Sequence, residues 1–263
     1  MVTLAGIFPP TQPPEQIGAV AAAAESAGLE QLWIWEDCFM ESGIATATAM
    51  LATTSRITVG IGLLPVPLRN VALTAMEIAT LSRLFPGRLI AGVGHGVLDW
   101  MGQAGARVES PMTLLREYTA ALYALLHGET VTTRGRYVNL DAVALDWPPA
   151  VVPPLLVGGI KPRTVSLAGE LADGVIIPGG VSPEEVRTSV GQLHGQRSTG
   201  RGPADVVVFI STPAGRPAAG VAATVSEYAA AGATHVAVNA AEDDADLERF
   251  AGFLAREVGP LLR

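Results

Sequence analysis

The run ITVGIGLLPVPLRNVALTAMEIATLSRLFPGRLIAGV, residues Ile57–Val93, contains a complete strand–helix–strand unit. Ile57–Leu64 is a short run of β-branched, leucine and glycine residues and predicts a strand, whereas Val71–Leu84 has the length and composition of a helix. The Pro86-Gly87 turn ends that helix, and Arg88–Val93 predicts the next strand. Two such strands joined through a helix are typical of a parallel sheet covered by helices.

The same alternation extends in both directions along the chain. The other predicted strands are Val2–Phe8, Gln31–Trp35, Leu155–Val157, Val175–Ile177, Asp205–Ile210 and His235–Val238. The other predicted helices are Glu15–Ala27, Ser42–Thr54, Thr113–Leu126, Arg163–Leu171, Pro183–His194, Ala219–Ala231 and Leu247–Leu262. Eight strand–helix units in order, with no linker and no change in composition, predict one α/β domain over residues 1–263, a (β/α)₈ TIM barrel. A doubly wound open sheet is the alternative, but the first turn, Phe8-Pro9-Pro10, lacks its glycine-rich fingerprint.

One segment interrupts this rhythm. Thr130–Trp147 holds two β-like pieces, Thr130–Thr133 and Tyr137–Leu140, on either side of Arg134-Gly135. This pattern predicts a small β-hairpin insertion after the fourth helix of the repeat.

The composition excludes several classes of protein. Of the 263 residues, 49% are hydrophobic and 16% charged, as expected for parallel strands buried on both faces. No apolar run is long enough for a membrane span and no signal peptide is expected, while the net charge of −8 disfavours binding to nucleic acid. A single cysteine, Cys38, excludes an internal disulfide and a multi-cysteine metal site, so we expect a cytoplasmic protein.

In a barrel of this kind, binding and catalytic residues gather on the loops that follow the strands. These loops hold Phe8-Pro9, Glu36-Asp37-Cys38, Leu64-Pro65, Gly94-His95-Gly96, Gly158-Gly159-Ile160-Lys161, Pro178-Gly179-Gly180, Ser211-Thr212 and Asn239. They are rich in glycine, poor in ionisable groups, and contain neither a metal-ligand cluster nor a Ser-His-Asp set. Such a site suits a flat organic cofactor that performs the chemistry itself.

The fifth loop is the clearest local motif. Gly158-Gly159 stands before a helix start, whose backbone N–H groups favour an anion, and Lys161, the one lysine of the chain, and Arg163 follow. The motif predicts either a phosphate cradle or an ordinary tight turn with solvated charges.

Four further positions each have two interpretations. His95 is placed to contact a cofactor or donate a proton, or else makes a structural hydrogen bond. Asp37 is an acid–base candidate, or else caps the second helix or pairs with Arg69. Cys38 is interpreted as a packing residue rather than a reactive thiol. Trp100-Met101 either covers the pocket or fills the core.

Six stretches together resemble the bacterial luciferase-like superfamily of flavin- and F420-dependent oxidoreductases, nearest to its methylenetetrahydromethanopterin reductase type. They are WEDCF (Trp35–Phe39), VGIGLLPVPLRN (Val59–Asn70), EIATLSRLFPGRL (Glu77–Leu89), GVGHGVLDWM (Gly92–Met101), SPMTLLREY (Ser110–Tyr118) and LAGELADG (Leu167–Gly174). The resemblance implies a bulge in the third strand with a non-proline cis peptide at Gly62–Leu63, which lies behind the cofactor ring. It also implies a phosphate pocket at Gly158-Gly159 and a polar residue near the ring at Asp37.

From these arguments we predict hydride transfer between bound coenzyme F420 and a small organic substrate, with Asp37 and His95 as catalytic residues. The predicted cofactor-binding residues are Gly62, Leu63, Gly94, His95, Gly96, Gly158, Gly159, Ile160, Lys161, Arg163 and Gly179. The alternatives are an FMN-dependent monooxygenase served by a separate reductase, and a non-catalytic flavin-binding protein. The resemblance further implies a homodimer, and no metal site, nucleic-acid partner or membrane partner is expected.

Overall fold

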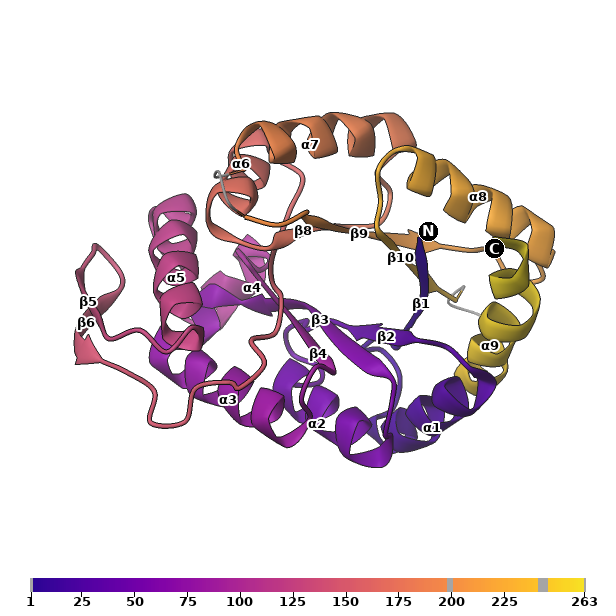
Figure 1. The fold of residues 1–263 in the computed structure, drawn as a ribbon, viewed down its shortest axis with the longest axis horizontal. Coiled ribbons are helices and arrows are strands. Elements are labelled where there is room, and N and C mark those ends of the chain that lie inside the picture. Colours follow the sequence, from indigo (N-terminus) through magenta and orange to yellow (C-terminus); the bar gives the residue numbers. More distant parts are fainter. Residues whose placement is uncertain (1, 198–200, 241–245, 263) are drawn as a thin grey trace.

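The strands of the protein form a closed ring with the helices outside it (Figure 1). The computed structural model describes residues 2–197, 201–240 and 246–262. In that part of the chain, the parallel strands close a barrel in the order β1-β10-β9-β8-β7-β4-β3-β2. The strands are β1 (Thr3–Ile7), β2 (Gln31–Ile34), β3 (Thr58–Pro65), β4 (Leu89–Gly94), β7 (Leu155–Gly158), β8 (Gly174–Ile177), β9 (Asp205–Ser211) and β10 (His235–Asn239). The predicted (β/α)₈ barrel is confirmed, and the open sheet is excluded because β1 pairs with both β2 and β10.

The helices begin and end close to the predicted residues. They are α1 (Ile17–Ala27), α2 (Gly43–Thr53), α3 (Val71–Leu84), α5 (Pro111–Leu126), α6 (Pro162–Leu171), α7 (Pro183–Gly195), α8 (Ala218–Ala230) and α9 (Leu247–Phe253). Short single turns are η1 (Pro14–Gln16) and η2 (Val66–Leu68). Among the described residues, no helix is long and apolar enough to cross a bilayer.

Two helical segments differ from the sequence prediction. The helix α4 (Leu98–Gln103) follows β4, where the sequence predicted only a loop. The predicted helix Leu247–Leu262 is not continuous, because α9 passes into the π-helical turn η3 (Leu254–Val258) and the 3₁₀ turn η4 (Gly259–Leu262). Gly259-Pro260 stands where the last turn tightens, which fits the missing N–H of proline.

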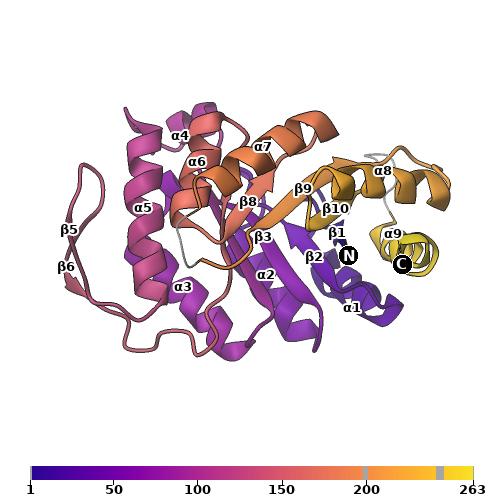
Figure 2. The ribbon, with the colours of Figure 1, turned by 45° about the horizontal axis from the view of Figure 1, so that its top comes forward.

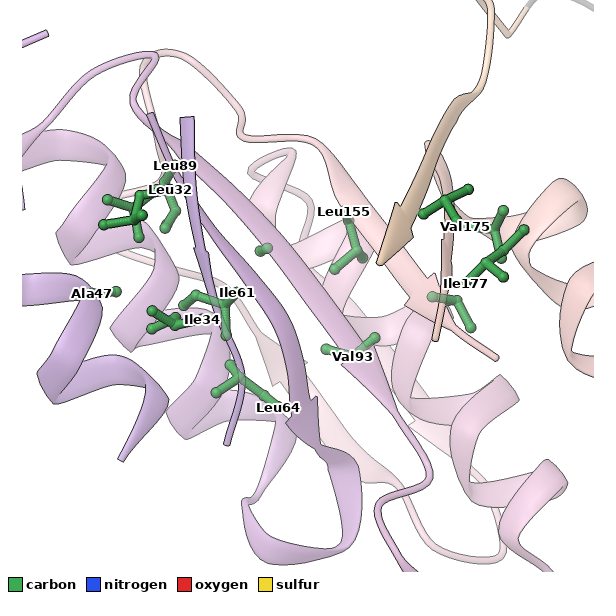
Figure 3. Close-up of a cluster of buried hydrophobic side chains, with 14 of the residues drawn as sticks. Leu32, Ile34, Ala47, Ile61, Leu64, Leu89, Val93, Leu155, Val175 and Ile177 are labelled. Atoms are coloured by element: carbon green, nitrogen blue, oxygen red, sulfur yellow. The ribbon is translucent and has the colours of Figure 1, made fainter. Parts of the chain in front are cut away.

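The strands separate two apolar layers because successive side chains point to opposite faces. The outer layer fills the space between strands and helices, as Figure 3 shows for Leu32, Ile34, Ile61 and Ala47. The inner layer fills the barrel and consists of Ala5, Ile7, Trp33, Ile90, Leu156, Ile176, Val207, Phe209 and Ala237. The barrel is therefore packed in its middle, and open space is confined to its rim.

The hairpin insertion lies outside the barrel, beyond α5 (Figures 1 and 2). It pairs β5 (Val131–Arg134) with β6 (Asn139–Val143) in antiparallel register, which confirms the predicted hairpin. The carboxylate of Glu117 on α5 accepts the backbone N–H groups of Arg136, Tyr137 and Val138 and holds the hairpin against that helix.

Candidate active site

A pocket of about 580 Å³ opens at the carboxyl ends of the strands. Eight of the residues predicted for the site line it, namely Asp37, Gly62, Leu63, His95, Gly96, Gly158, Gly159 and Gly179. Gly94 lies directly beneath, and the remaining three, Ile160, Lys161 and Arg163, are not part of this lining. The loops that the barrel topology selects from the sequence therefore converge on one cavity.

The floor of the pocket is formed by a bulge in β3. The register between β3 and β4 shifts between Ile61 and Leu64, and the peptide Gly62–Leu63 is cis, both as predicted. The side chain of Leu63 then lies across β4 and β7, because a Cβ added at Gly94 or Gly158 would come within 2.4 or 2.2 Å of its Cδ2. Glycine at these two positions is what leaves room for the leucine.

Aromatic side chains form the walls. Trp35 and Phe209 line the pocket with ring centroids 5.9 Å apart, and Trp33 packs edge-on against Phe209 from below. Trp100, on α4, also lines the pocket, whereas Met101 is fully buried in the core. The two interpretations of Trp100-Met101 therefore each apply to one residue of the pair.

Asp37 is half-buried in the wall of the pocket. Its Oδ2 accepts a hydrogen bond from Trp35 Nε1 at 2.8 Å. Burial raises the pKa of Asp37, and the bond from Trp35 opposes that rise only in part. Asp37 is thus a carboxyl group held at a fixed position with an increased tendency to keep its proton.

The alternative roles considered for Asp37 belong to its neighbour Glu36. Glu36 pairs with Arg69 through both carboxylate oxygens and accepts the N–H of Gly43 at the start of α2 at 2.7 Å. Arg69 also approaches Glu77 at 3.3 Å. The alternative interpretation of Asp37, as a cap of the second helix or a partner of Arg69, is wrong, because Glu36 is the residue of this loop that faces Arg69 and Gly43.

His95 lies at the edge of the pocket. Its Nε2 is 3.4 Å from Thr164 Oγ1. Its Nδ1 is buried and has no hydrogen-bond partner among the described residues. Burial lowers the pKa of His95, opposed in part by the backbone of Pro111, so the imidazole is neutral near pH 7. A neutral ring with one open nitrogen suits a hydrogen bond to a ligand.

Cys38 follows Asp37 on the same loop, and the peptide Cys38–Phe39 is a second non-proline cis bond, which the sequence did not predict. Burial and the negative charges of Glu36 and Asp37 raise the pKa of the Cys38 thiol. A thiol of raised pKa is a poor nucleophile, in agreement with its interpretation as a packing residue.

The turn after β7 offers fewer amide donors than predicted. The N–H of Gly159, directly after β7, donates to the carbonyl of Ile176 in β8 at 2.9 Å. The N–H groups of Ile160 and Lys161 have no acceptor within the described ranges and stand directly before α6. An anion at this turn would therefore meet these two amides rather than that of Gly159.

Lys161 and Arg163 lie in an adjoining cavity of about 780 Å³, which shares His95 with the main pocket. Both side chains are exposed, because Lys161 caps α6 and the chain turns outward there. The same cavity contains Glu109, which pairs with Arg136 of the hairpin. The two cavities thus adjoin at His95; both have largely apolar linings, and the second also carries two cationic groups and the carboxylate of Glu109.

Several lining residues were not predicted as site residues. Trp35, Phe209, Ser211 and Asn239 all stand at strand ends with side chains that point into the barrel. The buried Oδ1 of Asn239 has no hydrogen-bond partner among the described residues. The alternation of inward and outward residues along the last strands would have indicated all four.

The described residues contain no group of three or more histidine, cysteine or acidic side chains placed to hold a metal ion.

A family model described as "Luciferase-like monooxygenase" matches residues 2–257. The chain belongs to this family.

The chain is also similar in sequence to individual enzymes, among them a reductase and a dehydrogenase. The chain is 31% identical to a 5,10-methylenetetrahydromethanopterin reductase of Methanolobus tindarius over 76% of its own length and 61% of the reductase. It is 30% identical to an F420-dependent glucose-6-phosphate dehydrogenase of Nakamurella multipartita over 65% of its length and 54% of that enzyme. The match thus spans less than two thirds of either relative.

A solved structure supports the fold of this family member. The coenzyme F420 dependent tetrahydromethanopterin reductase from Methanopyrus kandleri superimposes with a TM-score of 0.85 at 20% identity, over 100% of this chain and 99% of that one. At this level of identity the likeness concerns the barrel architecture.

Proposed function

We propose that this luciferase-like protein is an oxidoreductase that transfers a hydride between bound coenzyme F420 and a small organic substrate. The observation that carries the proposal is the pair of adjoining cavities, one with aromatic walls and a leucine floor, the other with Lys161 and Arg163. FMN ends at its phosphate, whereas F420 continues into a polyanionic tail. Lys161 and Arg163 would attract the phosphate of either cofactor, but the volume of the second cavity leaves room for negative charges beyond that phosphate, which only F420 has. The glucose-6-phosphate dehydrogenase named above is F420-dependent, which favours the same choice.

The residues of the main pocket fit a planar ring. Leu63 supports one face, and the glycines beneath it let the leucine lie flat. Trp35 and Phe209 close the pocket against water, and the open Oδ1 of Asn239 is an acceptor for an N–H or O–H of a bound molecule. When bound, the deazaflavin ring supplies or accepts the hydride.

Asp37 handles the proton that accompanies the hydride. Its Oδ2 is fixed by Trp35, and burial raises its pKa, so the carboxyl keeps its proton to a higher pH than a free aspartic acid does. The neutral imidazole of His95 orients the ligand at the junction of the two cavities through its free nitrogen. The protein thereby contributes orientation, exclusion of water and one proton-transfer group.

Titration of the apoprotein with F420 and, separately, with FMN tests the proposal, with cofactor fluorescence as the readout. Quenching by F420 that saturates, and weakens about tenfold in Lys161→Gln, is expected because one charge-assisted contact is lost. Arg187→Gln is the matched control, since Arg187 pairs with Glu184 on the outer helix α7.

Tight binding of FMN with none of F420 would replace the proposal by the FMN-dependent monooxygenase. Binding of F420 without hydride exchange against any of a panel of carbonyl and imine compounds would leave a non-catalytic binding protein. The titration therefore decides between the two cofactors, and the hydride-exchange assay decides between an enzyme and a binding protein.

We also propose that the protein is a homodimer. Leu73, Met76 and Leu84 on the outer face of α3 are 46%, 58% and 63% exposed, and their spacing places them on one face of the helix. Light scattering of the wild type and of Met76→Glu provides the test, with a monomeric wild type as the contrary result.

A further inference from the structure

A separate cavity of about 390 Å³ lies outside the barrel wall, between the end of β9, the loop before α8, and α9. Figure 1 shows α8 and α9 as neighbours on this side of the barrel. Ser211 lines the main pocket, whereas the next residue, Thr212, lines this outer cavity. Because consecutive strand residues point to opposite faces, the wall of β9 separates the two cavities.

Three arginines surround the outer cavity, Arg216 from the loop and Arg249 and Arg256 from the C-terminal helical segment. One carboxylate, that of Glu257, lines it as well. Within the described ranges, none of the three guanidinium groups lies within 4.0 Å of a carboxylate oxygen. The chain as a whole has a net charge of −8, so three arginines around one cavity make this part of the surface unusually positive and favourable for an anion.

All three arginines are exposed, and two of them pass close to a glycine. A Cβ at Gly252 would come within 2.4 Å of Arg256 Nη2, and a Cβ at Gly220 within 3.0 Å of Arg216 Nε. Arg216 also donates to Thr224 Oγ1 at 2.9 Å. The positions of these two guanidinium groups are therefore partly fixed by the surrounding chain before any ligand arrives.

Thr212 provides an independent indication of a ligand. The residue is 6% exposed, and its Oγ1 has no hydrogen-bond partner among the described residues. Its backbone N–H is already used, because it donates to the carbonyl of Asn239 at 3.1 Å. A buried hydroxyl without a partner costs stability unless a bound group satisfies it.

We propose that this outer cavity binds a phosphate group of a small ligand, with the three arginines as charge partners and the Thr212 hydroxyl as an additional donor. Guanidinium groups form paired hydrogen bonds with phosphate oxygens, and the exposed rim gives a small anion access. The site is independent of the cofactor pocket and of the function proposed for it.

Calorimetric titration of the full chain with inorganic phosphate, near neutral pH and at constant ionic strength, tests the site. Saturable binding is expected, with affinity reduced about tenfold in Arg249→Gln and in Arg256→Gln because each variant loses one charge-assisted contact. Arg187→Gln should bind as the wild type does. Binding that is lost instead in Lys161→Gln would assign the phosphate to the turn before α6 and overturn the proposal.

Thr212→Val supplies a second measurement that a purely structural role would not reproduce. Without phosphate, the variant should unfold at the same or a higher temperature than the wild type, because an unsatisfied hydroxyl is removed. With phosphate, it should gain less stability than the wild type does. The absence of phosphate binding by the wild type would also overturn the proposal.

Discussion

The two ends of the barrel use polar side chains in opposite ways. At the amino ends of the strands, Glu25 accepts the backbone N–H groups of residues 55–57. Asp173 accepts the N–H of Leu155 at 2.9 Å, and Thr234 accepts that of Val206 at 2.8 Å. Each of these side chains satisfies a donor near the start of a strand and so stabilises the barrel.

At the carboxyl ends, polar atoms remain open. His95 Nδ1, Thr212 Oγ1 and Asn239 Oδ1 are buried without partners among the described residues. Near the amino end, the side chains named above satisfy backbone donors, although the buried Ser82 Oγ at the end of α3 has no partner among the described residues. At the carboxyl end, satisfied groups such as Glu36 stand beside open atoms whose cost a ligand can offset. Substitutions at the two ends should therefore change different measurable quantities.

The largest expected effect is at the carboxyl end. Asp37→Asn should slow hydride transfer by roughly 10²-fold or more, the usual contribution of an acid–base group, and change the free energy of unfolding little. Because burial raises the pKa of Asp37, the wild-type rate should vary with pH above the ordinary titration range of an aspartic acid, and the variant should lose that variation. Single-turnover absorbance of F420 at several pH values measures both. Asp141→Asn, in the exposed hairpin, is the control, and an unchanged rate in Asp37→Asn would remove Asp37 from the mechanism.

The next effect concerns stability at the amino end. A Cβ at Gly174 would lie 2.1 Å from the backbone oxygen of Asp205, so Gly174→Ala must push β8 and β9 apart. We expect a loss of about 3 kcal/mol in the free energy of unfolding, measured by urea denaturation. Gly191→Ala, on the outer helix α7 with open space around the added Cβ, should not destabilise. A normal midpoint for Gly174→Ala would show that the strands can separate locally.

The pH dependence of stability provides a third test at the amino end. Hydrogen bonds from the backbone at residues 55–57 lower the pKa of Glu25 from 4.5 to about 2, against the effect of burial. A lowered carboxyl pKa stabilises the fold above pH 4.5, and this contribution disappears as the pH falls towards 2. Glu25→Gln should therefore cost about 1–2 kcal/mol at neutral pH, after allowance for solvent screening, and progressively less in acid. Glu30→Gln serves as a control, and a pH-independent difference would contradict the assignment.

The smallest effect should have opposite signs at the two ends. Asn239→Leu should stabilise the ligand-free protein by about 1 kcal/mol, because it removes an unsatisfied carbonyl oxygen. Thr234→Val should destabilise it by about 1 kcal/mol, because the N–H of Val206 loses its side-chain acceptor. Chemical denaturation without cofactor measures the change in the free energy of unfolding for both variants. Changes of the same sign would show that side-chain hydrogen bonding does not distinguish the two ends.

The barrel strands could be placed from the sequence to within a residue or two, because β-branched runs and glycine turns define them sharply. The sequence analysis missed the helix α4, because its six residues, Leu98–Gln103, are too few to show a helical period and include Gly102. The end of α9 was placed as regular helix because periodicity does not distinguish an α-helix from the wider turn of η3.

The site was predictable at the level of loops but not of individual contacts. Barrel topology brings Asp37, His95 and Gly179 together whatever the loop conformation, so their convergence follows from strand order alone. Whether Glu36 or Asp37 faces Arg69 depends on backbone angles after β2, which the sequence does not specify. The same holds for Lys161, whose exposed side chain follows from its position as the cap of α6.

The support of Leu63 by Gly94 and Gly158 has a consequence for how this molecule can be altered by selection or by engineering. A glycine can only be replaced by something larger, so single changes at those two positions can make the cavity shallower but never deeper. Enlargement has to begin at Leu63 itself, and any bulkier residue introduced there would need the two small neighbours to remain as they are.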